Sequence, residues 1–223
     1  MIQRIAELTS YTRGTTSAIN RIRKTSINLL TNEEELLEFQ GLAYKNIGVR
    51  FPLDFLQAAR VFAVRNQRGV ICGGFALAKG EHSRVIKSLP TEAMNTLKSQ
   101  YPNYREDIFE ITALWLCRSE RSKTLSVRFW TKLYREVVRK KRPYFIYAFS
   151  SEKKKLGKIY QVVKPTRIFE GYTNILPGMN EPDHEIVEVG SVRAAHMAWV
   201  TQFSFLYRRL LHGRSAKKRV VYQ

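Results

Sequence analysis

The chain has 223 residues, 44% of them hydrophobic, which is the composition of a globular protein and excludes a disordered one. Its 38 Lys and Arg residues outnumber its 19 Asp and Glu residues, so the formal net charge is +19. A surface this positive favours an anionic partner. We expect DNA first, with an acidic carrier protein or an anionic membrane face as alternatives.

The two cysteines and four histidines predict no metal site. Cys72 and Cys117 lie in separate apolar runs, without the close pairs typical of structural zinc, and the histidines are scattered along the chain. Both cysteines therefore look like reduced core residues of a cytoplasmic protein. No apolar run approaches the roughly 20 residues that span a bilayer, and no export signal is recognisable.

The first part of the chain predicts an extension followed by the start of a domain. Residues 1–24 are polar and basic and form an N-terminal extension with no assigned chemistry. A strand is expected at 27–30, and the polar and acidic residues 31–34 then begin a helix. A second short helix is expected at 53–59, directly after Pro52.

A β-hairpin is expected next. Two apolar runs, 60–65 and 70–77, flank a short turn that contains Asn66 and Gly69. Gly73 and Gly74 lie within the second run, where glycine marks either a bulge or a close approach of another backbone or ligand. Residues 81–106 read as a polar insertion with a short helix at 91–98.

The segment from 107 to 171 is the most informative part of the sequence. A nearly all-apolar strand at 108–117 carries a single ionisable residue, Glu110. That carboxylate must be paired, protonated or facing a cleft, because burying an isolated charge is too costly. The basic turn 118–124 follows, then an amphipathic helix that Pro143 ends, then an aromatic strand at 144–149.

The last part of the chain carries a tyrosine segment and a further strand. Ile159-Tyr160-Gln161 follows a lysine-rich stretch, a strand is expected at 167–172, and 174–185 is rich in turn residues. We therefore predict a domain over 25–175 and a C-terminal extension with a basic tail over 176–223. No internal repeat is present.

This order of elements resembles the GNAT superfamily of N-acyltransferases over about residues 25–172. The resemblance implies an α/β (α+β) fold, with a mixed, mostly antiparallel sheet flanked by helices and a V-shaped split between its two central strands. It also implies a thioester donor, either acyl-CoA or an acylated carrier protein, whose pyrophosphate would lie on the first N–H groups of the helix after the central strand.

The donor turn of this sequence has no glycine anywhere between residues 117 and 130. Basic side chains would then contact the donor phosphates directly. The residues that the resemblance assigns to the donor are Arg118, Arg121, Ser122, Lys123 and Thr124.

Within the superfamily, short stretches resemble the phage Mom-like DNA modification proteins. They are Glu110-Ile111, the helix containing Ser126, Pro143 with its following strand, and 157–161 leading to 169–171. The resemblance implies transfer of an acyl-derived group to adenine in DNA. Ala113 stands where that family tends to carry arginine, and Ser150 stands near its usual aspartate.

Three residues are candidates for the chemistry of acyl transfer. Tyr160 follows the second core strand, where the resemblance places a tyrosine near the donor sulfur, and is the candidate general acid. Glu110 is either the general base or a buried partner for an arginine. Ser150 either binds substrate or caps the segment that follows it.

Basic segments interleaved with tyrosines are the candidate nucleic-acid surface. Basic side chains bind phosphates, and aromatic side chains stack on exposed bases. Modifying a base inside a duplex would require flipping it out. The residues assigned to this surface are Arg139, Lys140, Lys141, Arg142, Lys153, Lys154, Lys155 and Lys158.

Three functions are consistent with these patterns. The first is a GNAT-like transferase that acylates a nucleobase in DNA. The second is an N-acyltransferase that moves an acyl group from a carrier protein or coenzyme A to a small amine or a peptide, resembling acyl-homoserine-lactone synthases and long-chain N-acyl amino acid synthases. The third is a nucleic-acid-binding module without catalysis on the same scaffold.

Overall fold

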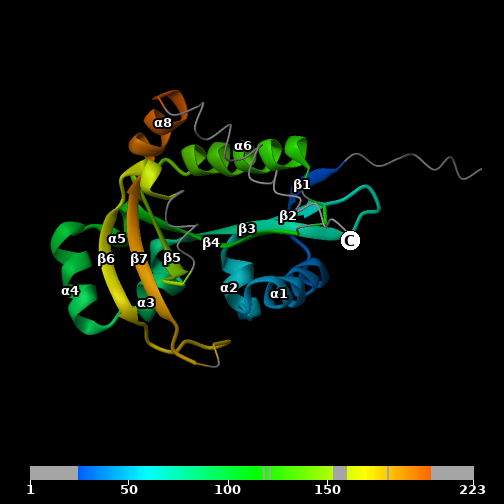
Figure 1. Ribbon diagram of the computed structural model, residues 1–223. Coiled ribbons are helices and arrows are strands. Elements are labelled where there is room, and N and C mark those ends of the chain that lie inside the picture. The colour runs from blue at the N-terminus through cyan, green and yellow to red at the C-terminus, as the bar shows by residue number, and fades with distance from the viewer. Residues whose placement is uncertain (1–24, 118, 121, 153–159, 180, 202–223) are drawn as a thin grey trace, which may run out of the picture.

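A single seven-stranded sheet organises the protein in the computed structural model, with strand order β1-β2-β3-β4-β5-β7-β6 (Figure 1). The structure describes residues 25–117, 119–120, 122–152, 160–179 and 181–201. The strands are β1 Ser26–Leu29, β2 Arg60–Arg65, β3 Ile71–Lys79, β4 Ile108–Leu116, β5 Tyr144–Ser150, β6 Thr166–Tyr172 and β7 His184–Ser191. All neighbours pair antiparallel except β4 and β5, which are parallel. The mixed, mostly antiparallel sheet expected from the sequence is confirmed.

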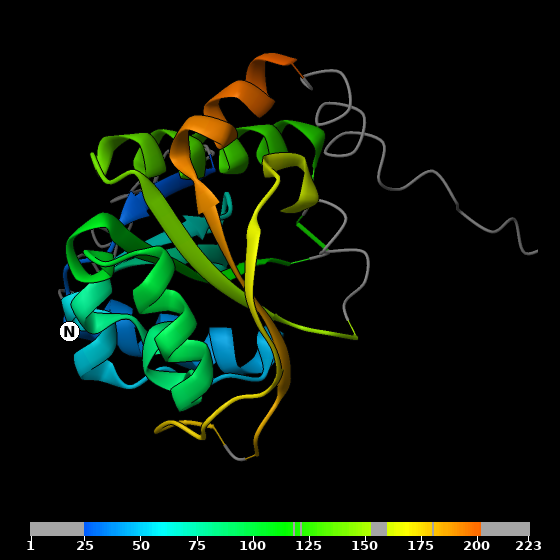
Figure 2. The same cartoon turned by 90° about the vertical axis from the view of Figure 1, so that its left-hand side faces the viewer.

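Helices cover both faces of the sheet (Figures 1 and 2). They are α1 Glu33–Ile47, α2 Leu53–Ala58, α3 Arg84–Ser88, α4 Thr91–Gln100, α5 Tyr104–Asp107, α6 Lys123–Arg139 and α8 Val192–Thr201, with short 3-10 helices at Gly80–His82 and Gln161–Val163. α6 and α8 lie on one face. α1 and α2 cover the opposite face at β1–β4, and α3 and α4 cover that same face at β4–β7.

α6 shows why these residues form a helix here. Ser122 caps its first turn by accepting a hydrogen bond from the backbone N–H of Leu125 at 3.0 Å. Leu125, Phe129, Leu133 and Val137 recur at helical spacing and are all buried. They pack on the aromatic residues of β2, β3 and β5, so this face of the sheet has a core rich in rings.

β4 and β5 pair for only three residues and then separate. Ile108, Phe109 and Glu110 are opposite Tyr144, Phe145 and Ile146, and no later pair exists between the two strands. β4 nevertheless continues to Leu116 and β5 to Ser150. The V-shaped split expected between the central strands is therefore present, and it begins just after Glu110.

A bulge in β4 lies beside the split. Gly74 of β3 is opposite Trp115 and Ala76 is opposite Thr112, so β4 carries one extra residue between these pairs. Ala113 has a φ of 51°, in the left-handed region that L-residues rarely adopt. The bulge reverses the alternation of the strand, so that Ile111 and Leu114 both pack on the α6 side.

Gly74 is a site of close backbone approach. A Cβ there would clash with the backbone oxygen of Phe62 on β2 and with the ring of Phe39 on α1. One of the two readings of the glycine pair, close approach, is therefore confirmed for packing within the protein.

Two parts of the chain contribute more to the fold than their sequences indicate. Residues 80–107 hold the predicted helix, now α4, and also α3 and α5, and they bury Val85, Ile86, Leu89 and Leu97 over the sheet. β7 lies between β5 and β6, so the boundary predicted at residue 175 separates β6 from its partner. The extension predicted at 1–24 and the tail from 202 onward lie outside the described residues.

Candidate functional site

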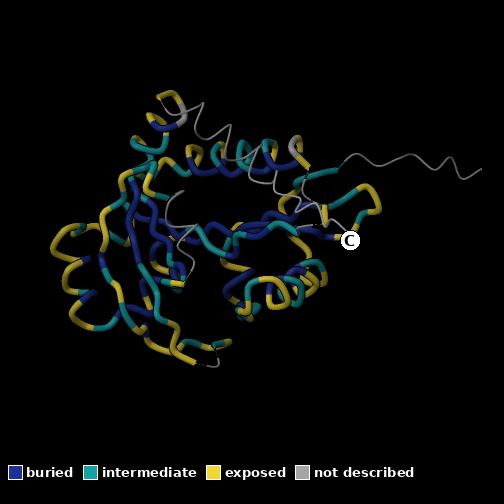
Figure 3. Tube along the Cα trace, in the orientation of Figure 1, coloured by how far each residue is buried: buried dark blue, intermediate teal, exposed yellow. Residues whose placement is uncertain are grey.

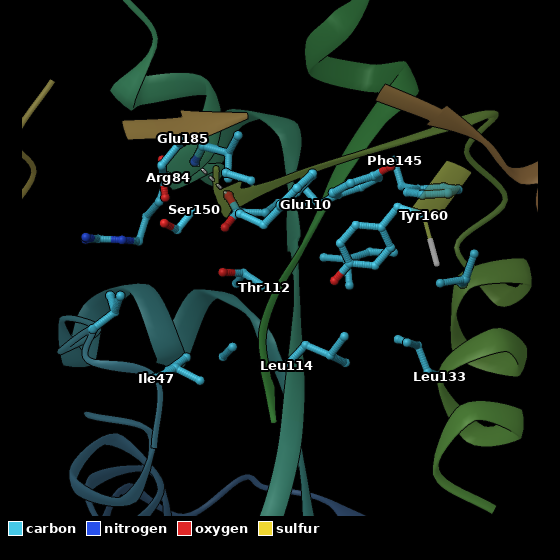
Figure 4. Close-up of a pocket in the computed structure, with 18 of the residues that line it drawn as sticks. Ile47, Arg84, Glu110, Thr112, Leu114, Leu133, Phe145, Ser150, Tyr160 and Glu185 are labelled. Atoms are coloured by element: carbon cyan, nitrogen blue, oxygen red, sulfur yellow. Dashed lines mark hydrogen bonds between the residues drawn. The ribbon is translucent and has the colours of Figure 1, made fainter. Parts of the chain in front are cut away.

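A cavity of about 320 Å³ occupies the split between β4 and β5. Its walls come from both faces of the sheet: α6, α8 and Tyr160 on one face, and α3 with the segment after α1 on the other. Figure 4 shows Leu133 and Tyr160 on one side of β4 and β5, and Arg84, Ser150 and Glu185 on the other, with Glu110 and Thr112 between them. The cavity therefore runs through the sheet, a route that the parting strands leave open.

Glu110 lies at the apex of the split and is fully buried. Its Oε2 accepts hydrogen bonds from the hydroxyl of Ser83 at 2.7 Å and from the backbone N–H of Val85 at 3.0 Å. Its Oε1 is buried with no hydrogen-bond partner among the described residues, and the carboxyl group lines the cavity. Burial raises the pKa of Glu110, although Ser83 and Val85, and after them the Thr112 side chain and the backbone N–H of Arg84, oppose the rise. A carboxylate of this kind accepts a proton near neutral pH more readily than an exposed one.

Arg84 lines the same end of the cavity, together with the carboxyl groups of Glu110, Asp183 and Glu185. The Arg84 guanidinium lies over the rings of Phe51 and Phe55, 5.8 Å from each centroid. Burial lowers the pKa of Arg84, while the charges of Glu110, Asp54 and Glu185 act in the opposite direction. Asp183 and Glu185 also line the cavity, so this end is polar and predominantly acidic.

Tyr160 lies on the opposite face, against the aromatic side chains of β5. Its ring centroid is 4.5 Å from that of Tyr147 and 5.4 Å from that of Phe149. Burial, and then the charge of Glu188, raise the pKa of Tyr160, so its hydroxyl stays protonated. Glu188 of β7 accepts hydrogen bonds from the Tyr147 hydroxyl at 2.9 Å and from the Gln161 side chain at 3.3 Å. This buried network holds the start of the segment that carries Tyr160.

The α6 side of the cavity is apolar. Its lining side chains are Trp130, Leu133 and Val137 from α6, Ala195 and Ala198 from α8, and Phe145 and Phe149 from β5. Tyr134 of α6 and His196 of α8 are hydrogen-bonded and stacked, which ties the two helices together above this arm. The cavity therefore joins an apolar arm to an acidic mouth.

The start of α6 lies at the open end of the split. The chain turns from the end of β4 into α6, whose first N–H groups have no intrahelical acceptor. Thr124 is exposed there, and the Ser122 hydroxyl is used in capping. Arg118 and Arg121 lie outside the described residues, as does the side chain of Lys123.

Solved structures with this arrangement cover most of the chain. FeeM, an N-acyl amino acid synthase from uncultured soil microbes, matches with a TM-score of 0.56 at 13% identity, over 81% of this chain and 98% of its own. Arabidopsis thaliana NAA60 in complex with acetyl-CoA gives 0.51 at 9% identity, over 76% and 99% of the two chains. The N-acetyltransferase from Staphylococcus aureus Mu50 gives 0.50 at 12% identity, over 76% and 98%. The protein has the GNAT fold.

Similarity in sequence is weaker than similarity in fold. No protein-family model matches the chain, and no curated protein matches it significantly. The likeness therefore lies in how the GNAT fold arranges its strands and helices, and residue roles must be argued from this chain's own geometry.

The GNAT fold brings together three of the predicted site residues. Glu110, Ser150 and Tyr160 all line the cavity, although Glu110 and Tyr160 approach it from opposite faces. Ser150 ends β5 and lies opposite Glu185 of β7. Of the two roles considered for Ser150, binding substrate agrees with this position in the cavity wall.

The predicted nucleic-acid residues that the structure describes lie elsewhere, where α6 ends. Arg139 pairs with the buried carboxylate of Glu136 at 3.1 Å, and Arg142 donates to the backbone oxygens of Arg105 and Ile108. Burial and then the charge of Arg60 lower the pKa of Lys140 to about 8. Lys141 is exposed. Lys153, Lys154, Lys155 and Lys158 lie outside the described residues.

Sequence reasoning missed Arg84, which lines the cavity, and Glu188, which lies behind the wall and accepts a hydrogen bond from Tyr147. Arg84 lies in the segment read as a polar insertion, although Ser83 before Val85-Ile86 is a helix-start signal. Glu188 lies in β7, which was not assigned as a strand of the sheet. Its neighbours across β5 and β6 become visible only in the folded sheet.

The described part of the chain contains no group of three or more His, Cys, Asp or Glu side chains that could hold a metal ion. No helix in that part is long and apolar enough to cross a membrane.

Proposed function

We propose that the protein is an N-acyltransferase that takes an acyl group from a thioester donor and transfers it to an amine. The observation that carries this proposal is the cavity through the split of a GNAT fold, with an apolar arm beneath α6 and α8 and an acidic mouth around Glu110. A thioester entering from the α6 side and an amine entering from the mouth would meet between β4 and β5.

The reaction needs a neutral amine, because an ammonium group has no lone pair. Glu110 takes the proton from the amine, directly or through water, and its raised pKa suits that task. The amine nitrogen then attacks the thioester carbonyl and the C–N bond forms. The nitrogen loses its second proton to solvent, and the C–S bond breaks with its electron pair leaving on sulfur.

Tyr160 acts on the leaving sulfur as a hydrogen-bond donor. A thiol has a pKa of about 8.5, and the pKa of Tyr160 is raised above the ordinary tyrosine value of about 10. Full proton transfer from Tyr160 to the thiolate is therefore uphill, whereas a hydrogen bond from a protonated tyrosine stabilises the developing charge. The thiolate takes its proton from solvent after release.

The apolar arm supports an acyl chain longer than acetyl. An acetyl group needs little room, but the side chains from α6, α8 and β5 enclose a continuous apolar lining. Each methylene buried there contributes roughly 0.8 kcal/mol to binding. The donor carrier is coenzyme A or an acidic acyl carrier protein, and the net charge of +19 favours either anion.

A nucleobase in DNA stays the alternative acceptor. The basic residues where α6 ends, around Lys140, favour an anionic polymer near the protein. The described part of the cavity mouth favours DNA less, since three carboxyl groups, those of Glu110, Asp183 and Glu185, line it beside the single guanidinium of Arg84. This contrast makes a small amine or a peptide the acceptor that the geometry supports better.

The deciding experiment is a transfer assay with purified protein. Acyl-CoA and acyl carrier protein donors from two to sixteen carbons are incubated with pooled amines or with duplex DNA, and products are identified by mass spectrometry. We expect acylated amines from the longer-chain donors. Modified nucleosides without acylated amines would support the DNA alternative, and no product from any donor would reject acyl transfer.

Tyr160→Phe provides the matched test of the site. Removing the hydroxyl keeps the ring stacked on Tyr147 and Phe149 but removes the hydrogen bond to sulfur, so we expect kcat to fall about 10- to 100-fold. The control is Tyr172→Phe, on an exposed tyrosine at the end of β6. Equal activity of the two variants would remove Tyr160 from the mechanism.

A further inference from the structure

Among the described residues, the acidic mouth of the cavity contains one guanidinium group, which the reaction above does not use. Arg84 lines the cavity beside Glu110, and Figure 4 shows it on the same side as Ser150 and Glu185. Arg84 is the first residue of α3, and α3 belongs to residues 80–107, which join β3 to β4. This connection therefore supplies part of the mouth as well as covering the sheet.

Arg84 is held by aromatic rings rather than by a carboxylate. Its guanidinium lies over Phe51 and Phe55, whose own rings are stacked with centroids 5.8 Å apart. Both rings attract the cation without consuming its strong hydrogen-bond donors, which stay available to a ligand. No carboxylate of the described residues lies within 4 Å of it. Its N–H groups are therefore not used in an ion pair with any described residue.

The charges around Arg84 are too distant to replace a bound anion. Glu110, Asp54 and Glu185 raise its pKa through charge alone, and burial outweighs them so that the net shift is downward. A half-buried guanidinium in this state gains from a ligand carboxylate, which matches its fork with two parallel hydrogen bonds.

Beside this cation lies a group suited to an amine. Glu110 Oε1 is buried, faces no hydrogen-bond partner among the described residues, and belongs to the cavity wall. An ammonium or amine nitrogen supplies the missing donor. The mouth thus presents an anion-binding fork and an amine-binding carboxylate next to each other.

We propose that the acceptor carries both an amine and a carboxylate, as a free amino acid does, and that Arg84 binds the carboxylate while Glu110 receives the amine. This proposal rests on the proposed acyl transfer and adds the class of acceptor to it. Arg84 sets specificity here and takes no part in bond making.

The test uses acceptor pairs that differ only in the carboxylate: phenylalanine and phenethylamine, tyrosine and tyramine, tryptophan and tryptamine. Each is assayed with one long-chain acyl donor, and kcat/KM is compared between the wild type and Arg84→Gln. We expect the wild type to prefer the amino acids. The variant should lose about 10- to 100-fold in kcat/KM for amino acids, the effect of one charge-assisted contact, with the amines changed less than about threefold.

Two further variants guard against a merely structural effect. Arg84→Lys keeps the charge and loses the fork, so it should fall between the wild type and Arg84→Gln. Arg105→Gln removes an exposed arginine that also stacks on a ring, that of Tyr104, away from the cavity, and should match the wild type. Thermal unfolding of each variant shows whether the fold is retained.

Equal kcat/KM for amines and amino acids in the wild type would overturn the proposal, and so would an equal loss on both in Arg84→Gln. Calorimetry separates this failure from failure of acyl transfer itself. It measures binding of N-acyl phenylalanine and N-acyl phenethylamine without turnover. We expect tighter binding of the carboxylate product, lost in Arg84→Gln; the absence of any acylated product would count against the proposed function alone.

Discussion

Two buried glutamates show how local partners decide the state of a carboxyl group. Glu110 receives hydrogen bonds from the neutral groups of Ser83 and Val85, and burial raises its pKa. Glu136 of α6 is also buried, which opposes its ionisation, but the hydrogen bond and charge of Lys132, together with the charges of Arg60 and Arg139, outweigh burial and lower its pKa. The first carboxyl is suited to exchanging protons, and the second holds an ion-pair cluster together.

Glu110 makes stability depend on pH, because its pKa is higher in the folded state than the ordinary value of about 4.3. The folded protein binds the proton more tightly, so its free energy of unfolding falls as pH rises from about 4.3 through the folded pKa. Glu110→Gln should remove this decline. Denaturant unfolding between pH 4 and pH 8 checks it, with the exposed Glu181→Gln as control; parallel curves for wild type and Glu110→Gln would contradict it.

Lys140 changes the free energy of unfolding with pH in the opposite direction. Its folded pKa of about 8 lies below the ordinary lysine value of about 10.4, because of burial and the charges of Arg60, Arg142 and Lys79. The unfolded chain binds the proton more tightly, so stability rises with pH between these two values. Lys140→Gln should be more stable than the wild type at pH 7, by roughly 0.5–1 kcal/mol after allowance for solvent screening.

Urea unfolding at pH 7 and at pH 10.5 tests this expectation. The advantage of Lys140→Gln should shrink at the higher pH, where the lysine of the folded wild type is neutral and no longer pays for burying its charge. Lys141→Gln, on the exposed neighbour, is the matched control and should be unchanged. A gain for Lys140→Gln that is the same at both pH values would exclude charge as its cause.

The elements that the sequence predicts well are those that local pattern determines. β2, β4, α6 and β5 have strong apolar or aromatic periodicity, and their observed bounds follow it to within a few residues. The bulge at Ala113 carries no glycine and gives no such signal. β7 falls inside the predicted C-terminal extension, because its place between β5 and β6 depends on pairing with strands far along the chain.

Because Ala113 lies in the bulge, we expect its position to accept glycine at a smaller cost in stability than a β-branched residue. Its φ of 51° is accessible to glycine but strained for valine, whose second γ-carbon crowds the backbone. Ala113→Val should cost about 1–3 kcal/mol in the free energy of unfolding, whereas Ala113→Gly should stay within about 1 kcal/mol of the wild type. Equilibrium denaturation compares them, and a valine variant as stable as the wild type would contradict the strained geometry.

If the proposed acyl chain lies in the apolar arm, the side chains of α8 should limit the length of chain that the protein accepts. Ala198 is buried and lines the apolar arm, so Ala198→Phe should fill the arm and lower kcat/KM for long-chain donors at least tenfold more than for acetyl donors. Val200→Phe adds the same ring at an exposed position of α8 and is the control. A uniform loss across all chain lengths would mean that α8 does not line the acyl site.

On the scale of the whole molecule, the sheet separates two chemically different sides. Beneath α6 and α8 the side chains are aromatic and aliphatic, and Tyr160 is protonated. On the other face, Arg84, Glu110 and Glu185 form a charged mouth. In the described part of the chain, the parting of β4 and β5 connects these sides. The sequence predicted the parting through the order of elements and named Glu110 and Tyr160, but it contained no sign that they belong to opposite faces.

This arrangement has a kinetic consequence. In the proposed reaction donor and acceptor would enter the cavity from opposite faces of the sheet, so neither would need to depart before the other arrives, and the protein itself would never carry the acyl group. Initial rates measured over a matrix of both substrate concentrations should give double-reciprocal lines that intersect. Parallel lines, typical of a covalent acyl-enzyme released in two halves, would show that the passage serves only one substrate at a time.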